Sequence, residues 1–161
     1  MGLLPPEDAV RLGVVGPVAR GSGLVMDVRK DSPYAAYPDL KFDVITEQGC
    51  CVHSRAMVRL RELFESFSLI RQCCAAMPDG PVAVHMGEIP STEACARSEA
   101  PRGEVFYYIR TDGTDIPKRL HWRVPSYMNW EALGVMMRDC KVADVAMITN
   151  SIDPCVSCTE R

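Results

Sequence analysis

The sequence predicts an α+β fold that is mainly helical. From about residue 51 to 77, apolar side chains recur every three or four positions, which is typical of one long amphipathic helix. Two short segments, 105–109 and 120–124, are rich in aromatic and β-branched residues and predict strands. The remaining segments are short and divided by Gly and Pro. With 161 residues, the chain is long enough for one ordinary domain, which we place at 1–161.

The first forty residues predict little regular structure. Residues 6–12 favour a short helix that Gly13 stops. The Gly-rich stretch 13–23 lacks the Gly-Lys-Ser/Thr ending of a phosphate loop, so we do not predict a nucleotide site there. Residues 31–43 contain two prolines and two tyrosines and predict an irregular loop.

The long helix carries the strongest periodic signal. Pro78-Asp79-Gly80-Pro81 ends it, and at 1.5 Å per residue it would span about 40 Å. The chain offers few helices to cover so long an apolar stripe, which suggests packing against another polypeptide. The stripe comprises Met57, Leu60, Leu63, Phe64, Phe67, Ile70, Cys74 and Met77. Charged residues are expected on the opposite face: Arg59, Arg61, Glu62, Glu65 and Arg71.

The second half of the chain predicts a small ribbon and further short helices. Residues 83–103 are mixed and are expected to form a loop. Residues 111–115 supply the turn of a two-stranded antiparallel ribbon. Short helices are expected at about 129–137 and 142–149. Asp153-Pro154 is expected to end the helical structure before the last segment begins.

Composition excludes several classes of function. Eighteen basic and twenty-one acidic residues give a net charge of −3, which offers no electrostatic footprint for nucleic acid. No apolar run approaches the roughly 20 residues of a membrane span, and no cationic stretch followed by an apolar one marks a signal peptide. The eight cysteines are not evenly spaced as in a secreted disulfide framework, so we expect a cytosolic, reducing compartment. The six that precede Cys155 are expected to be small buried hydrophobic residues.

Cys155 and Cys158 form a C-x-x-C near the end of the sequence. Two thiolates at that spacing can hold one soft metal, so the pair could be half of a zinc site, a redox dithiol or a coincidence. A thioredoxin-like dithiol needs a following helix to lower the thiol pKa, and here the sequence stops. Cys50-Cys51 and His53 are possible further donors, although adjacent cysteines chelate poorly.

The sequence around this pair resembles the Asp-Pro-Cys-x-x-Cys ending of nickel–iron hydrogenase large subunits. The energy-converting, membrane-associated type is the most similar, and the 49 kDa (D) subunit of respiratory complex I shares the same ancestry. The cysteine pair favours hydrogenase, because complex I subunits lack it. Five further segments carry the resemblance in order: 16–23, 27–30, 33–37, 99–104 and 123–126.

The resemblance implies a role for each matched residue. Cys155 would be a terminal thiolate on nickel, and Cys158 would bridge nickel and iron in a centre whose iron carries diatomic ligands. Arg102 would present a fixed cation over the two metals. Pro125 and Ser126 would line the pocket of the iron cyanides. Without the resemblance, a surface ion pair of Arg102 with a neighbouring acidic residue, Glu99 or Glu104, is the favoured explanation.

Two departures from the family pattern define the expected partners. The family's first C-x-x-C, which supplies the other two thiolates, is missing, so the chain resembles only the C-terminal part of a large subunit. Arg161 stands where other hydrogenases have a histidine near magnesium, which puts that metal in doubt. The resemblance implies an N-terminal segment carrying the other C-x-x-C, an iron–sulfur small subunit and membrane-arm subunits, in a cytoplasmic complex peripherally associated with the membrane.

The expected reaction is therefore H₂ ⇌ 2H⁺ + 2e⁻, with this chain active only beside its partners. The missing C-x-x-C favours a different function. In that alternative the chain is a non-catalytic docking or quinone-module subunit of a complex I-like NADH:quinone oxidoreductase assembly and binds no nickel.

Overall fold

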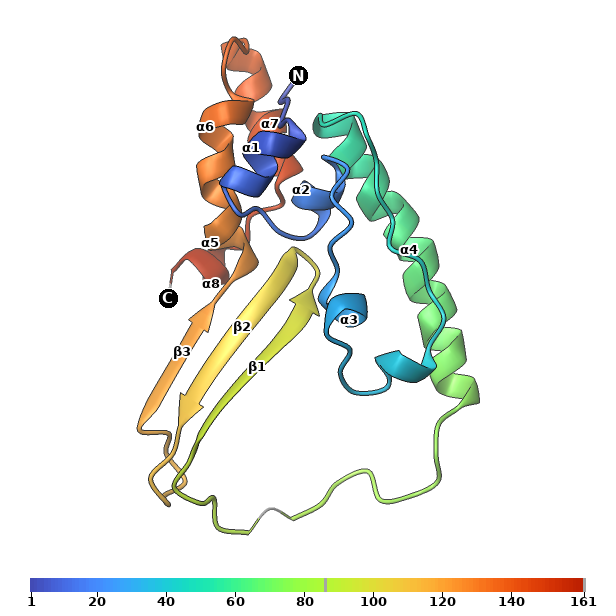
Figure 1. The fold of residues 1–161 in the computed structure, drawn as a ribbon, viewed down its shortest axis with the longest axis vertical. Helices are drawn as coiled ribbons and strands as arrows, with labels where there is room; N and C mark the ends of the chain where they lie inside the picture. The colour runs from blue at the N-terminus through green and yellow to red at the C-terminus, as the bar shows by residue number, and fades with distance from the viewer. Residues whose placement is uncertain (86, 161) are drawn as a thin grey trace.

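The computed structural model describes residues 1–85 and 87–160 and confirms the α+β prediction. Figure 1 shows short helices from both ends of the chain gathered at one end of the molecule, the long helix α4 along one side, and a small sheet beside it. The first half contains α1 (Pro6–Arg11), α2 (Pro17–Arg20), α3 (Val28–Asp31), the 3-10 helix η1 (Tyr37–Asp39) and α4 (Val52–Ala75). The second half contains α5 (Pro125–Asn129), η2 (Trp130–Ala132), α6 (Leu133–Met136), η3 (Val142–Asp144), α7 (Val145–Ser151) and α8 (Val156–Thr159).

The sheet is antiparallel, in the order β1-β2-β3. Its strands are β1 (Glu93–Ala100), β2 (Gly103–Arg110) and β3 (Arg119–Arg123). The prediction that residues 83–103 form a loop was wrong for β1, which pairs with β2 along its whole length. The sequence of β1 is rich in Ala and Glu and has low strand propensity. Its extended conformation is therefore set by pairing with the aromatic strand β2 rather than by its own residues.

The main hydrophobic core lies at the helical end of the molecule. It joins the first helices to the last ones, so residues far apart in sequence stabilise one another. The turn between β1 and β2 packs against the N-terminal segment at Gly16, beside this core. The candidate site lies at that turn. Its fully buried members are Leu4, Ala9, Val14, Val18, Ala19, Ala132, Met136, Ile148 and Ile152.

Helix α4 begins and ends within two residues of its predicted bounds. The side of the helix that packs against the core is not the predicted apolar side. Its buried residues are Ser54, Arg55, Val58 and Leu69. Much of the predicted apolar stripe is exposed, with Leu63 at 53% and Phe64 at 66%. Two of the charged residues expected toward solvent, Arg59 and Glu62, instead line an open cavity. The expectation that the stripe needs another polypeptide agrees with this exposure.

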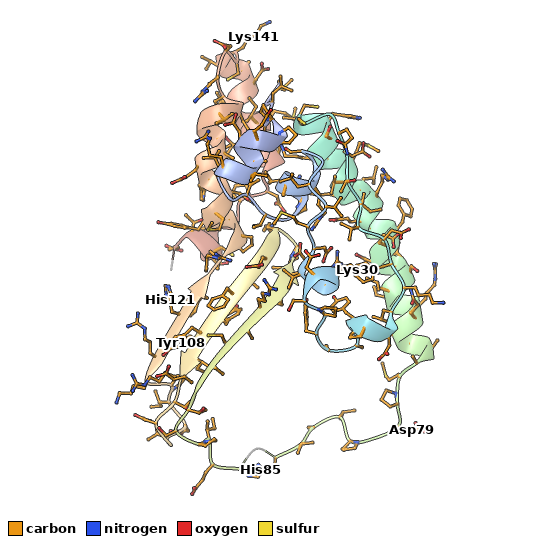
Figure 2. All side chains as sticks on the ribbon, viewed as in Figure 1. Lys30, Asp79, His85, Tyr108, His121 and Lys141 are labelled. Atoms are coloured by element: carbon orange, nitrogen blue, oxygen red, sulfur yellow. The ribbon has the colours of Figure 1, made fainter. Side chains whose placement is uncertain are left out.

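A long exposed connection joins α4 to β1. It runs past Asp79 and His85 along the outside of the molecule (Figure 2). The prediction that the first six cysteines are buried was wrong: Cys73, Cys74 and Cys95 are exposed, and the other three are partly exposed. Cys73 and Cys74 lie in the last turn of α4, and Cys95 lies on the sheet's edge strand, so neither place packs against the core. Among the described helices, none is long and apolar enough to span a bilayer.

Candidate functional site

The C-x-x-C occupies one short turn that is attached to the helical end of the molecule. Cys155 precedes α8 and Cys158 lies within it. α8 packs against α5, whose first turn contains the buried residues Pro125 and Ser126. The Ser126 hydroxyl oxygen accepts a hydrogen bond of 3.0 Å from the backbone N–H of Cys155. A rigid core element therefore fixes where the C-x-x-C begins.

The surroundings of Cys155 lower the pKa of its thiol and so favour the thiolate form. Its pKa is lowered to about 7, first by the Ser157 hydroxyl and then by the side chain and backbone amide of Cys158, with a smaller contribution from the Arg102 charge. The Cys155 sulfur lies 3.1 Å from the Ser157 hydroxyl oxygen. The prediction that no helix begins at the pair to lower a thiol pKa was wrong, because Cys155 is the N-cap of the one-turn helix α8 and the backbone amide of Cys158 helps to lower the pKa. A thiolate near neutral pH is the form that binds soft metals.

Arg102 lies in the turn between β1 and β2 and points to the segment that leads into Cys155. Its Nε donates to the Asp153 carbonyl oxygen at 2.8 Å, and its Nη2 donates to the Asp153 carboxylate at 3.1 Å. Arg102 thus makes an ion pair, but not with Glu99 or Glu104, which pair with other arginines. The double contact holds the guanidinium at the base of the C-x-x-C turn.

The turn that carries Arg102 is held by close backbone packing. Gly16 has a φ of +66°, and a Cβ at that position would clash with the Arg102 carbonyl and with Gly103. Asn129, at the end of α5, accepts from the Val15 N–H at 2.9 Å and donates to the Val15 and Arg102 carbonyls at 3.3 and 3.5 Å. The Gly-rich segment therefore serves as a close-packing surface for the Arg102 turn.

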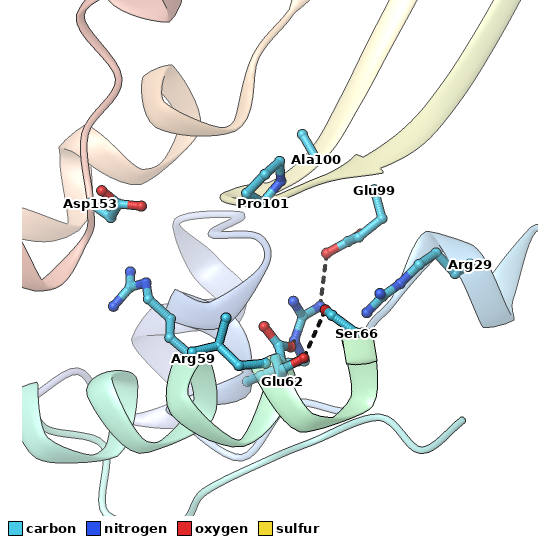
Figure 3. A pocket seen from close by; sticks show the side chains of 10 residues that line it. Arg29, Arg59, Glu62, Ser66, Glu99, Ala100, Pro101 and Asp153 are labelled. Carbon is cyan, nitrogen blue, oxygen red and sulfur yellow. Dashed lines mark hydrogen bonds and ion pairs between the residues drawn. The ribbon is translucent and has the colours of Figure 1, made fainter. Parts of the chain in front are cut away.

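A buried group of charges lies next to Arg102, and we call it the Arg20 cluster: Arg20, Asp27, Arg29, Glu62 and Glu99. The guanidinium of Arg20, 2% exposed, contacts Glu62 and Glu99, each at 2.8 Å, as the dashed lines of Figure 3 mark. Asp27, whose side chain is fully buried, lies 3.7 Å from Arg20 and accepts a hydrogen bond of 2.8 Å from Arg29.

The carboxyl groups of the Arg20 cluster differ in their proton affinity. Burial raises the pKa of Glu62 and of Glu99, and Arg20 only partly offsets it. Burial also acts to raise the pKa of Asp27, but the hydrogen bond and charge of Arg29 outweigh it and the net pKa is lowered. Asp27 is thus held ionised, whereas Glu62 and Glu99 are disposed to take up a proton.

An open cavity of about 320 Å³ connects the Arg20 cluster with the Arg102–Asp153 pair. Asp153 and Pro101 line one part of it, and Glu62, Glu99 and Arg29 line another. In Figure 3, Arg59 reaches from α4 toward Asp153. The Nε and Nη2 atoms of Arg59 are buried and make no hydrogen bond within the described residues.

The structure thus brings the predicted site residues into one region, where the sheet meets the helical end of the molecule. Pro125 and Ser126 contact the C-x-x-C region, and Arg102 binds Asp153, two residues before Cys155. No group of three or more His, Cys, Asp or Glu residues that could hold a metal is found in residues 1–85 and 87–160. Arg161, to which the magnesium argument applied, lies outside the described residues.

Sequence reasoning missed several residues of this region. Asp153 and Glu99 stand inside the recognised motifs, but only the fold shows which arginine each one pairs with. Asn129 carries no sequence signal, because its partners lie 114 and 27 positions away. Ser157 lies between the two cysteines, and its proximity to Cys155 was the one available signal of its effect on the thiol.

The chain is similar to hydrogenase and NADH–quinone oxidoreductase subunits. The family described as "Respiratory-chain NADH dehydrogenase, 49 Kd subunit" matches residues 1–89 and 83–161. The chain is 55% identical to the carbon monoxide-induced hydrogenase of Rhodospirillum rubrum over 100% of its own length and 45% of the relative. It is 38% identical to formate hydrogenlyase subunit 5 of Escherichia coli, covering 100% of the chain and 28% of the relative. It is also 38% identical to an NADH-quinone oxidoreductase subunit of Roseiflexus sp. strain RS-1, covering 95% of the chain and 44% of the relative. The chain thus spans less than half the length of these curated relatives.

Proposed function

Because this chain belongs to the respiratory-chain NADH dehydrogenase 49 kDa subunit family, we propose that it is the C-terminal portion of a nickel–iron hydrogenase large subunit. In this role it contributes half of the thiolate ligands for H₂ oxidation and proton reduction within a multisubunit energy-converting complex. The observation that carries the proposal is the C-x-x-C turn, in which Cys155 is fixed by Ser126 and its pKa is lowered to about 7. The 55% identity to a carbon monoxide-induced hydrogenase supports the same function.

The donor set fits one half of a four-thiolate metal site. Cys155 and Cys158 are both partly exposed, and the disposition of Cys155 toward thiolate suits a soft metal. Cys155 and Cys158 would hold the nickel–iron group through their thiolates. When bound, the two-metal centre supplies the electron chemistry of hydrogen, while the protein supplies ligands, orientation and charge.

The neighbouring residues would act on this centre through position and charge. The Asp153 contacts prevent Arg102 from rotating freely, so its cation stays directed to the base of the C-x-x-C turn. Its charge favours the Cys155 thiolate. Pro125 and Ser126 form the buried wall behind the turn, where we place the iron cyanide pocket.

The proposal requires partners. An N-terminal segment carrying the other C-x-x-C would complete the ligand set, an iron–sulfur small subunit would carry the electrons, and membrane-arm subunits would anchor the complex at the cytoplasmic side of the membrane. The exposed apolar face of α4 offers a surface for such contacts, because exposed apolar patches mark interaction sites. Magnesium is not assigned to this chain.

A second candidate function is a non-catalytic docking or quinone-module subunit of a complex I-like assembly. The 38% identity to the Roseiflexus NADH-quinone oxidoreductase subunit favours it.

Metal analysis of a reconstituted complex distinguishes the two functions. The chain would be co-expressed with the segment carrying the missing C-x-x-C and with hydrogenase maturation proteins, and nickel, iron and zinc would be measured. We expect nickel and iron together in the wild type, and loss of both in Cys155→Ser and in Cys158→Ser. Cys95→Ser, which changes an exposed cysteine on β1, is the matched control and should retain the metals. Absence of nickel from the wild type, or unchanged nickel in the two ligand variants, would favour the non-catalytic alternative.

A further inference from the structure

Two buried glutamates from distant parts of the chain share a single guanidinium. Glu62 comes from α4 and Glu99 from β1, and their side chains are 19% and 6% exposed. Arg20 Nη1 donates to Glu99 Oε1 at 2.8 Å. Arg20 Nε and Glu62 Oε1 lie 2.8 Å apart as an ion pair, but they are not aligned as a hydrogen bond. Glu62 is thus the less firmly held of the two carboxyl groups.

The charges of the Arg20 cluster do not balance when every group is ionised. Three carboxylates, those of Asp27, Glu62 and Glu99, face two guanidinium groups, those of Arg20 and Arg29. Asp27 is fully buried and is held by Arg29, so the excess negative charge falls on the glutamate pair. One proton on Glu62 or Glu99 would neutralise it, because an unpaired charge is costly in a buried place.

Every element packed around the pair contributes a charged or titratable group. Arg20 comes from α2, Arg29 from α3, and Arg59 from α4, one turn before Glu62. The Tyr34 hydroxyl accepts from the Glu99 backbone N–H at 3.1 Å, and the Glu99 carboxylate accepts from the Val28 N–H at 3.2 Å. The carboxylate of Asp153 lines the same cavity and is a further negative group that faces the pair. Arg59 offsets part of the negative charge, but its Nε and Nη2 make no hydrogen bond to either glutamate.

The cavity extends from this glutamate pair to Asp153, two residues before the first cysteine of the candidate metal site. Glu62 and Glu99 line it together with Asp153 and Pro101, which adjoin Arg102 and the C-x-x-C turn. A volume of about 320 Å³, whose lining includes the charged side chains of Glu62, Glu99 and Asp153, is large enough for several water molecules. Water in that space can carry a proton between the two glutamates and Asp153, two residues before Cys155.

We propose that Glu62 and Glu99, joined by Arg20, form a proton-relay station that holds one exchangeable proton and passes protons between the cavity and the metal-binding turn. The inference rests on the proposed hydrogenase function. In each transfer one carboxylic O–H bond breaks, a cavity water takes the proton, and the carboxylate that forms keeps its contact with Arg20. No electrons move in this step. Proton transfer on the reverse path regenerates the protonated pair.

The first test measures proton holding in the chain itself. Infrared spectra of protein with ¹³C-labelled glutamate would be recorded against pH in H₂O and D₂O. We expect a deuterium-sensitive C=O band of a protonated glutamate to persist above about pH 4.3, the ordinary pKa of Glu. The isosteric variants Glu62→Gln and Glu99→Gln should each shift or remove this band. The matched control is Glu65→Gln, which changes a carboxyl on α4 that accepts a hydrogen bond from the Asp43 N–H, outside the cluster. A band that is the same in all four proteins, or absent above that pH in the wild type, would overturn the proposal.

The second test measures proton delivery in the reconstituted complex. Conversion of para- to ortho-hydrogen requires only splitting and recombination at the metals, whereas exchange of D₂ with water also requires protons to leave the site. We expect Glu62→Gln and Glu99→Gln to slow the solvent exchange by about a hundredfold, with para–ortho conversion and the Glu65→Gln control preserved. Unchanged solvent exchange in both variants would overturn the relay. An inactive wild-type complex would instead overturn the proposed function, and the infrared band would still decide whether the pair holds a proton.

Discussion

The hydroxyl oxygen of Ser126 accepts a hydrogen bond of 3.0 Å from the backbone N–H of Cys155. Ser126 is 1% exposed and lies in the first turn of α5, so its position is fixed by the surrounding core. Cys155 begins the C-x-x-C turn, which packs against α5. This hydrogen bond thus links a buried side chain of α5 to the first of the residues that we assign as metal ligands.

We expect Ser126→Ala to lower the free energy of unfolding by about 1 kcal/mol, because the Cys155 N–H loses its partner. The same variant should loosen the C-x-x-C turn, seen as faster hydrogen exchange of the amides after residue 154. Ser91→Ala removes a hydroxyl with one long, 3.4 Å hydrogen bond and serves as the control. Equal exchange rates in the two variants would show that Ser126 does not anchor the turn.

The reactivity of Cys155 should depend on pH with a midpoint near 7. Its pKa is lowered to about 7, so the thiolate is populated above that pH and lost below it. We expect its alkylation rate, followed by mass spectrometry of the C-terminal peptide, to rise through pH 7. Ser157→Ala removes the largest cause and should move the midpoint upward, toward the ordinary thiol pKa of about 8.5. An unchanged midpoint would mean that the Ser157 hydroxyl does not stabilise the thiolate.

Gly16→Ala should destabilise the protein by about 1–3 kcal/mol, because alanine at a φ of +66° is strained. The added Cβ would also clash with the Arg102 carbonyl. Gly134→Ala is the matched control: it lies in α6, where a Cβ meets nothing within 4 Å, and it should stabilise the protein by about 0.5–1 kcal/mol. Chemical denaturation of both variants measures the difference. Similar free energies of unfolding would argue against the close contact between the Gly16 and Arg102 turns.

Local patterns in the sequence predicted where helices lie better than they predicted which residues those helices contact. The 3.6-residue periodicity of α4 is a property of its own residues, and its bounds were predicted to within two residues. Which face of α4 would meet the core was not predictable in this way. That face is chosen by long-range contacts of Arg55 with Ser151 and Gly2 and of Glu62 with Arg20. β1 was missed for the same reason, since its partner strand determines its conformation.

The candidate site was predicted as a set of residues but not as a network. The sequence motifs singled out Arg102, Ser126 and the two cysteines as candidates, because those residues occur together in a known family. Their contacts depend on the pairing of segments 29 and 51 positions apart, which no local pattern encodes. The Arg20 cluster was hidden because charged residues on a helix are normally expected to face solvent.

The exposed face of α4 should make the isolated chain self-associate. Phe64 and Phe67 are 66% and 52% exposed and pack edge to face with ring centroids 6.4 Å apart. We expect sedimentation velocity to detect oligomers of the wild type and fewer of them in Phe64→Ser or Phe67→Ser. Val82→Ser changes an exposed apolar residue outside the helix and should leave the distribution unchanged. A wild-type chain that remains monomeric at high concentration would show that this face does not drive association.

Arg102→Lys should reduce hydrogen turnover in the reconstituted complex far more than it reduces stability. Lysine keeps the positive charge but cannot reproduce the two contacts of the guanidinium with the Asp153 carbonyl oxygen and carboxylate. Because Arg102 is 31% exposed and Asp153 44% exposed, the loss of this pair should cost at most about 1 kcal/mol of stability. A misplaced cation beside the metals, in contrast, should lower turnover by about a hundredfold, since small displacements of catalytic groups have effects of that size. Asp153→Asn retains the backbone carbonyl contact and should have an intermediate effect. Turnover assays and thermal unfolding of all three proteins provide the comparison, and activity that falls only in proportion to the folded fraction would assign Arg102 a purely structural ion pair.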